Sequence, residues 1–225
     1  MADSTPIRDA ATVIVVRDPA GTPSVLMGQR GAKAAFMPNK FVFPGGAIDP
    51  GDAKISLAAP IPEGCAARLS EASDGPQPDA IAAAAIRELW EETGQVLGTP
   101  RQWFDPPPDW SGFAATGHRP DASSLRFIFR AVTPPGRPRR FDARFLLTEA
   151  SALRGDPDDF SQASDELSHL RWVPLAEARD LDLPFITEIV LAEIGGMLPD
   201  LAAPKVVPFF QNDDEDSQMR ALGRI

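Results

Sequence analysis

Residues 79–94, DAIAAAAIRELWEETG, have the clearest helix pattern in the chain. Alanine, the residue with the highest helix propensity, fills most of the first half. Gly94 is a good helix stop, because glycine adopts the left-handed backbone that ends many helices. Asp79 follows a proline and is a typical N-cap residue. We therefore predict a helix over residues 79–93 that is capped by Asp79.

The second half of this helix carries a cluster of carboxylates. At about 100° per residue, Glu88, Glu91 and Glu92 share an arc of roughly 100°, and the apolar side chains fall on the opposite face. Arg87 is spaced to pair with Glu91, whereas Glu88 and Glu92 form a like-charge i,i+4 pair. Hard oxygen ligands gathered in this way are those that Mg²⁺ or Mn²⁺ prefers. A solvated acidic face would give the same pattern, so the helix alone leaves both interpretations open.

A glycine-rich turn precedes this helix in the chain. Residues 41–52, FVFPGGAIDPGD, place two adjacent glycines after a short strand and end on an acid, Asp52. Glycines in this position let the backbone turn sharply or approach a ligand closely. Residues 53–78 separate this turn from the helix and are rich in Pro, Gly, Ser and Ala. We interpret residues 53–78 as an insertion outside the core, with a short helix around residues 65–72.

The rest of the chain alternates between strand and helix patterns. Short β-branched or apolar runs bounded by turn residues predict strands, at residues 12–17, 24–29, 125–132, 141–147 and 169–173. Helices are expected directly after the last of these strands and at residues 184–197. Residues 211–225 are expected to form a polar tail. Strands interleaved with helices predict an α/β fold with a mixed sheet between helical layers, in one domain over residues 1–225.

The composition of the chain limits which classes of partner and which cellular compartment are expected. The chain has 22 basic and 32 acidic residues, for a formal charge of −10. A field of this sign disfavours nucleic acid polymers and anionic membranes as partners. We expect no signal peptide and no membrane span, because the sequence has neither a long apolar run nor a leader pattern. The single cysteine, Cys65, fits a reducing compartment, and we expect a cytoplasmic protein.

Together, the glycine turn and the helix resemble the signature of the Nudix hydrolases. That signature is a glycine, five residues, an acid, seven residues, and then Arg-Glu-apolar-x-Glu-Glu-x-Gly-apolar. Gly46 and Asp52 match the first spacing, with Asp in place of Glu, and Asp79 matches the second spacing, before Arg87. RELWEETG matches the rest, but polar Gln95 takes the final apolar position. The resemblance implies a Nudix-type α/β/α sandwich with a mixed β-sheet and an insertion inside the signature.

The resemblance also implies an activity and a set of residues for it. The reaction is divalent-metal-dependent attack of water on a diphosphate bond, in a nucleoside diphosphate linked to a further group. Glu88, Glu91, Glu92 and the carbonyl of Gly46 are then the expected ligands of Mg²⁺ or Mn²⁺. Arg87 is expected to orient a glutamate, most simply Glu91, one turn further along the helix.

Other residues are expected around this centre. Asp52 is a candidate acid of the site, with no contact to the metal as the alternative. Family members draw a further acid from a loop outside the signature, and Glu166 is our candidate for that catalytic base or extra ligand. Arg30, Arg139 and Arg140 are candidate substrate-binding residues, because arginine forms charge-assisted bonds with phosphate. Each has an ordinary surface role as its alternative.

The substrate within the class stays open. Residues 25–52, the split signature and RRFDARFLL at residues 139–147 resemble the branch of the peroxisomal coenzyme A diphosphatase of mammals and its bacterial relatives. That resemblance implies coenzyme A or acyl-CoA, but the longer coenzyme A signature of another branch is not reproduced. ADP-ribose, NADH and dinucleoside polyphosphates are the alternatives. A non-catalytic ligand-sensing module is the alternative of another class, and a homodimer is left open.

Overall fold

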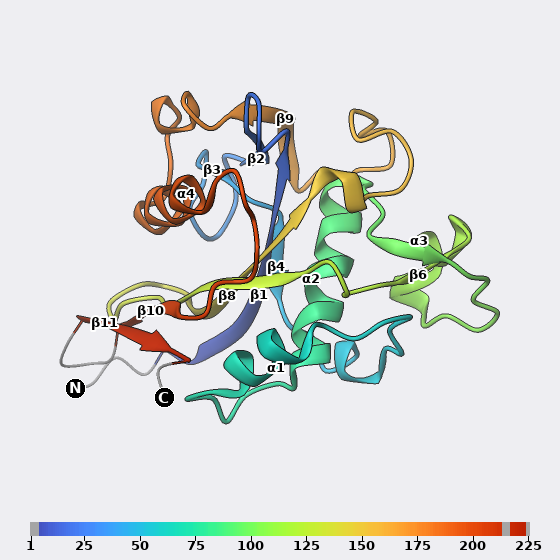
Figure 1. Ribbon diagram of the computed structural model, residues 1–225, viewed down its shortest axis with the longest axis horizontal. Helices are drawn as coiled ribbons and strands as arrows, with labels where there is room; N and C mark the ends of the chain where they lie inside the picture. The colour runs from blue at the N-terminus through green and yellow to red at the C-terminus, as the bar shows by residue number, and fades with distance from the viewer. Residues whose placement is uncertain (1–4, 213–216, 224–225) are drawn as a thin grey trace.

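The computed structural model describes residues 5–212 and 217–223, and nine of the strands described there form one mixed sheet (Figure 1). These strands are β1 (Ile7–Arg17), β2 (Ser24–Arg30), β3 (Phe41–Val42), β4 (Gly45–Ala47), β7 (Arg126–Val132), β8 (Arg140–Glu149), β9 (Leu167–Pro174), β10 (Val207–Asn212) and β11 (Ser217–Leu222). Their order is β11-β10-β7-β8-β1-β2-β3, with β4 paired to β1 and β9 paired to β2. β1 runs parallel to β8 and β7 parallel to β10, so the sheet is mixed, as predicted.

Helices cover both faces of this sheet. The α-helices are α1 (Glu63–Ser70), α2 (Pro78–Thr93), α3 (Ser111–Ala115) and α4 (Phe185–Met197), and a separate hairpin joins β5 (Gly98–Pro100) to β6 (His118–Pro120). Every helix among the described residues is too short or too polar to cross a lipid bilayer.

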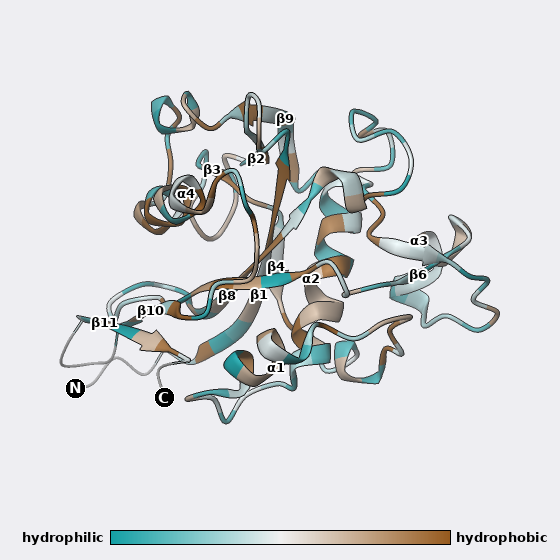
Figure 2. Ribbon diagram, viewed as in Figure 1, coloured by the Kyte–Doolittle hydropathy of each residue, from teal (hydrophilic) through white to brown (hydrophobic). Residues whose placement is uncertain are grey.

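Alternation along β1 builds the two cores. Val13 and Val15 belong to the core shared with α1 and α2, while Ile14 and Val16 belong to the core shared with α4. Successive side chains of a strand point to opposite faces, so one strand supplies both layers. Figure 2 shows the hydrophobic residues gathered along α2 and β2. The α/β/α sandwich predicted from the sequence is therefore confirmed.

Two segments differ from expectation. The helix expected after residue 173 is only a 3₁₀ turn, Ala178–Asp180. The polar tail expected over residues 211–225 instead includes the end of β10 and all of β11, which pair antiparallel at the sheet edge. Residues 213–216 and 224–225 lie outside the described part. The first four residues of β11 are exposed, and backbone pairing at an edge needs no apolar face, which is why the strand pattern was missing.

The insertion, residues 53–78, is part of the core, contrary to the sequence-based interpretation. Cys65 and Leu69 on α1 are each 1% exposed, and Ile55 and Ile61 before the helix are also buried. All four belong to the same core cluster as the alanines of α2. Because this segment covers α2, the alanine half of α2 is buried on every side rather than on one face. Small side chains let the two helices approach closely.

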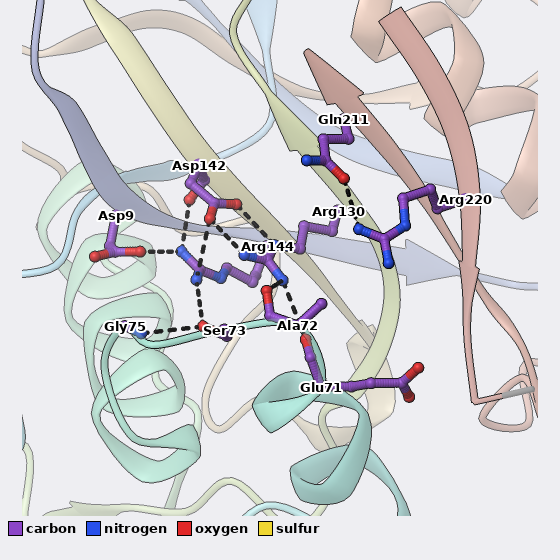
Figure 3. Close-up of polar contacts among 10 residues, drawn as sticks. All are labelled: Asp9, Glu71, Ala72, Ser73, Gly75, Arg130, Asp142, Arg144, Gln211 and Arg220. Carbon is purple, nitrogen blue, oxygen red and sulfur yellow. Dashed lines mark hydrogen bonds and ion pairs between the residues drawn. The ribbon is translucent and has the colours of Figure 1, made fainter. Parts of the chain in front are cut away.

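A network of buried arginines fastens the end of the insertion to the sheet (Figure 3). Arg130 on β7 forms a bidentate pair with Asp142 on β8, with N···O distances of 2.9 and 2.6 Å. The same guanidinium donates to the carbonyl of Ala72 at 3.0 Å. Arg144 donates to Ser73 Oγ at 3.2 Å and also contacts Asp142. The chain that enters α2 is thus held by side chains of two central strands.

Replacing Leu69 tests whether the insertion is structural. We expect Leu69→Ala to lower the free energy of unfolding by about 2–5 kcal/mol, because it removes buried methyl groups and leaves a cavity. Ser70→Ala, at the exposed end of the same helix, should change it by less than about 0.5 kcal/mol. Urea unfolding of both variants checks this, and equal stability of the Leu69 variant and the wild type would show that α1 contributes nothing to the core.

Candidate active site

The glycine turn and the C-terminal half of α2 lie against each other. The N–H of Gly45 donates to Glu92 Oε2 at 2.7 Å. A Cβ at Gly46 would lie 2.5 Å from the carboxyl carbon of Glu88, so any side chain at this position would displace the Glu88 carboxylate from the glycine turn. The two halves of the signature, separated by residues 53–78 in the chain, therefore form one site. The contact of Gly45 was not predicted from the sequence, where the adjacent pair of glycines was the available signal.

Arg87 is the centre of the ion pairs at this site. Its Nε and Nη2 donate to the two carboxylate oxygens of Asp52, each at 3.0 Å. Its Nη1 donates to Glu88 at 2.8 Å and to Glu91 at 3.2 Å, and Nη2 also donates to the carbonyl of Ala47. Arg87 is 6% exposed. Burial lowers its pKa, but the hydrogen bond to Asp52 and the neighbouring carboxylates outweigh this and raise it overall.

The two aspartates of the split signature have different positions. Asp52 is 2% exposed, and its carboxylate is turned toward Arg87 while also accepting from the N–H of Asp49 at 2.8 Å. Asp79 does not cap α2, contrary to our prediction. The cap residue is Gln77, without a side-chain hydrogen bond, and Pro78 is the first helical residue. Proline is favoured at that first position, which moves Asp79 into the exposed first turn.

The three glutamates are not a solvated acidic face. Glu92 is 2% exposed, and burial is the main cause that raises its pKa to about 8. Burial likewise raises the pKa of Glu88 to about 7, against the opposing effect of Arg87. Burial also raises the pKa of Glu91, again opposed by Arg87. Buried carboxylates with raised pKa values lack enough compensating positive charge, so the site favours an added cation.

Two predicted residues from other elements lie beside the glutamates. The charge of Glu166, just before β9, contributes to raising the pKa of Glu88, Glu91 and Glu92. The charge of Arg30, at the end of β2, acts in the opposite direction on Glu92. The Nε of Arg30 is buried and has no hydrogen-bond partner among the described residues.

Arg139 and Arg140, our other candidate substrate-binding residues, lie apart from the glutamates of this site, and the structure does not bring them together with Arg30. Arg140 begins β8 and pairs with Ile7, four positions along β1 from Ala11, the partner of Gly46. It is buried, donates to the carbonyls of Thr133 and Asn212, and lines a separate cleft beside β10. Arg139 is exposed in the preceding turn. A basic run in a hairpin gives no information about which end of the sheet the hairpin occupies.

The side chains present fit a divalent ion by their chemistry. Carboxylates on one side of a helix, next to a glycine whose backbone approaches closely, offer the hard oxygen donors that Mg²⁺ and Mn²⁺ prefer. Within residues 5–212 and 217–223, no three His, Cys, Asp or Glu side chains converge tightly enough to form a ready-made metal cage. Arg87 holds Glu88 and Glu91, and Gly45 holds Glu92. A cation would therefore compete with Arg87 for these carboxylates.

Comparison with known proteins agrees with this geometry. The NUDIX domain model matches residues 74–193, about half of the chain. The chain belongs to the Nudix family. That match begins after Gly46 and Asp52, so the contacts to Glu88 and Arg87 are what place the glycine turn in the Nudix site. Members of this family generally use divalent metal ions.

Individual relatives share the fold over most of the chain. A nudix hydrolase of Caenorhabditis elegans, numbered 7, is 31% identical over 186 residues, which are 77% of this chain and 53% of that protein. This chain thus spans about half the length of that relative. The crystal structure of a NUDIX hydrolase from Alicyclobacillus acidocaldarius has a TM-score of 0.66 at 31% identity, covering 88% of this chain and 96% of that one. The MutT protein from Methanosarcina mazei Go1, with a TM-score of 0.50 at 13% identity, shares the fold, covering 86% of this chain and 96% of that one.

The Arg87–Asp52 pair can be tested against a matched exposed partner. We expect Asp52→Asn to lower the free energy of unfolding by roughly 3 kcal/mol, because it removes one charge of a buried, bidentate ion pair. Asp49 also lies near Arg87, at 3.7 Å, but its side chain is 61% exposed. Asp49→Asn should therefore cost less than about 1 kcal/mol. Chemical denaturation of both variants checks this, and similar costs would show that burial does not set the strength of the Arg87–Asp52 pair.

The buried carboxylates should also make stability depend on pH. Because burial raises the pKa of Glu92 from 4.5 to about 8, the folded protein binds this proton more tightly than the unfolded chain does. In EDTA, the contribution of Glu92 to stability is therefore present below about pH 4.5 and is lost as the pH rises toward about 8. We expect Glu92→Gln to reduce this decline by roughly 2–4 kcal/mol.

The control for this experiment is Glu193→Gln, a substitution of an exposed glutamate on α4. It should leave the pH dependence of unfolding as it is in the wild type. Thermal and urea unfolding between pH 5 and pH 9 measures the difference. Parallel curves for wild type and the Glu92 variant would mean that Glu92 has no raised pKa in the folded protein.

Proposed function

We propose that the protein hydrolyses a diphosphate bond in a nucleoside diphosphate derivative, in a reaction that needs a divalent metal ion. The observation that carries this proposal is the cluster of glutamates on α2, with Glu88 and Glu92 largely buried, docked on the glycine turn of β4. Such a cluster destabilises the metal-free protein, whereas a bound cation would offset the repulsion. Membership of the Nudix family and the named hydrolases among its relatives support the same reaction.

The metal ligands in this proposal are Glu88, Glu91, Glu92 and the carbonyl of Gly46. When bound, Mg²⁺ or Mn²⁺ would neutralise phosphate oxygens and lower the pKa of a coordinated water. Without an ion, the three carboxylates are held by hydrogen bonds within the protein. The Gly45 N–H fixes Glu92, and Arg87 fixes the other two carboxylates while Asp52 holds Arg87 itself.

Glu166 and Arg30 complete the proposed site. Glu166 is exposed at the edge of the glutamate cluster, where its carboxylate can accept the proton of the attacking water. Arg30, with a buried Nε that has no partner among the described residues, can donate to a substrate phosphate beside Glu92. The arginine clamp expected from residues 139 and 140 lies elsewhere, so Arg30 is the one predicted phosphate ligand that remains at the site.

Coenzyme A or an acyl-CoA is the substrate that we propose within this class. The support is the resemblance of residues 25–52, the split signature and residues 139–147 to the coenzyme A diphosphatase branch. Cleavage would give 4′-phosphopantetheine, or its acyl form, and adenosine 3′,5′-bisphosphate. ADP-ribose, NADH and dinucleoside polyphosphates contain the same reacting bond, and they serve as competing substrates in the test.

An assay of the purified protein with Mg²⁺ or Mn²⁺ tests reaction and substrate together. Coenzyme A, acetyl-CoA, ADP-ribose, NADH and a dinucleoside polyphosphate are supplied to wild type, Glu92→Gln and the control Glu193→Gln. We expect turnover of coenzyme A species by wild type and control. Glu92→Gln should lose about 10²–10⁴-fold in kcat, because it removes a ligand of the metal ion, and that ion would polarise the reacting groups.

Each outcome of this assay has a distinct meaning. Cleavage of another diphosphate in place of coenzyme A would retain the reaction and reject the proposed substrate. A Glu92→Gln variant as active as wild type would reject the metal site. A folded protein that binds Mn²⁺ and cleaves none of these compounds would favour the ligand-sensing module over the enzyme.

A further inference from the structure

Gln95 is the residue at which this chain departs from the Nudix signature, and it is buried. It follows Gly94, which ends α2 with a left-handed φ of 72°, and it is 2% exposed. Its Nε2 donates to the carbonyl of Asp159 at 2.8 Å. Its Oε1 is buried without a hydrogen-bond partner among the described residues. The side-chain amide thus donates one hydrogen bond, to the loop that contains Asp159, and its oxygen has no hydrogen-bond partner among the described residues.

An apolar residue would be more stable at this position. A buried acceptor without a partner costs about 1–3 kcal/mol, and the residue after a left-handed helix cap normally makes an apolar contact with the last turn. The signature itself has an apolar residue there. Positions at which a sequence breaks a local rule without a gain in stability are expected to be functional. The one side-chain hydrogen bond that Gln95 makes among the described residues, to the carbonyl of Asp159, is therefore the feature that needs an explanation.

That bond joins α2 to the loop between residues 153 and 166, which leads to β9. Two residues of the sheet hold the first half of this loop. Trp172 Nε1, on β9, donates to the Pro157 carbonyl at 3.0 Å, and Arg17, on β1, forms an ion pair with Asp158 at 2.9 Å. In Figure 1 the loop lies beside the C-terminal end of α2. The second half of the loop, residues 159–166, follows these two anchors.

The second half of the loop is docked on the end of α2. The N–H of Ser164 donates to the carbonyl of Glu91 at 2.8 Å. Gly94 leaves room for the loop, since a Cβ there would lie 3.0 Å from the Cβ of Gln162. Gln95 supplies the side-chain hydrogen bond of this contact, at Asp159. The loop is therefore fixed to α2 at one point on either side of Gln162.

Glu166 follows Ser164 by two residues, and its backbone N–H lies 3.4 Å from Ser164 Oγ. Its position relative to the glutamates of α2 is thus set from two sides, by the docking of residues 159–164 and by Leu167, which pairs with Arg30 at the start of β9. A displacement of about 1 Å in a catalytic group can reduce turnover by 10²-fold. We propose that Gln95 is a positioning residue, which latches this loop onto α2 and so holds Glu166 beside Glu88, Glu91 and Glu92. The catalytic part of this inference rests on the proposed function of Glu166.

Hydrogen exchange tests the latch without any assay of activity. Gln95→Met keeps the size of the side chain but removes the donor to Asp159. We expect the amides of residues 159–166 to exchange at least about 10-fold faster in this variant, because the docked state opens more often. The melting temperature should stay unchanged or rise, since the unsatisfied Oε1 is removed as well.

The control is Gln162→Met, the same substitution on the same loop at an exposed side chain. It retains the Cβ that packs against Gly94, and the exchange of residues 159–166 should match that of wild type. Wild-type exchange rates in Gln95→Met would overturn the latch. A fall in melting temperature with unchanged exchange would overturn it too, because Gln95 would then be an ordinary core residue.

A double-mutant cycle tests whether the latch acts through Glu166. With the best substrate, Gln95→Met should lower kcat by about 10–100-fold and change KM by less than about 3-fold. In a Glu166→Gln background, the same substitution should lower kcat by less than about 2-fold, because the residue that it positions is already disabled. Equal losses in both backgrounds would overturn the inference. If wild type cleaves no substrate, the proposed function fails, and the exchange measurement still decides whether Gln95 latches the loop.

Discussion

The guanidinium of Arg87 joins the glycine turn, Asp52 and two of the glutamates of α2, and its burial constrains the rest of the chain. A buried guanidinium needs a full set of acceptors, because an unpaired buried charge is strongly destabilising. Asp52 satisfies two of its donors, and the carbonyl of Ala47 and the glutamates of α2 satisfy others. The glycine turn, the 3₁₀ turn after it (Asp52–Lys54) and α2 are therefore held in one arrangement by a single side chain. An ion that bound Glu88 and Glu91 would have to compete with Arg87 for their carboxylates.

The position of the insertion follows from this constraint. Asp52 must stay beside Arg87, and Arg87 lies nine residues after the start of α2. Residues 53–78 must therefore lead from the middle of α2 back to its beginning, and α1 within this segment packs on both α2 and β7. A segment confined to this path covers the alanines, which is why Cys65 and Leu69 are buried. The arginines of β7 and β8 then fix its end, so the segment that interrupts the signature in sequence completes the core in space.

Local sequence patterns predicted most helices and strands. Contacts between residues distant in the sequence determined which side chains are buried and which residues pair, and local patterns do not contain that information. The alanine run and Gly94 fixed α2 to within a residue, and the helical period grouped the three glutamates correctly. The same information could not choose between Asp52 and Asp79, because the partner of Arg87 is set by tertiary contact. The apolar residues of the insertion follow no regular helix or strand period and are interrupted by Pro, Gly and Ser, so its burial could not be predicted from the sequence. Arg140 was misplaced because strand register, not composition, decides where a basic hairpin lies.

The first half of α2 has features that stabilise a buried helix, whereas the second half carries features that destabilise the fold. The first half has a proline at its start and a run of buried alanines. The second half carries a like-charge pair, two largely buried glutamates with raised pKa values, and then the half-satisfied amide of Gln95. These unfavourable features lie within one stretch, where the glycine turn and the loop of Glu166 also converge. Because the alanine half packs well enough to hold the helix in place, the other half can retain carboxylates that weaken the fold but have the chemistry to bind a cation.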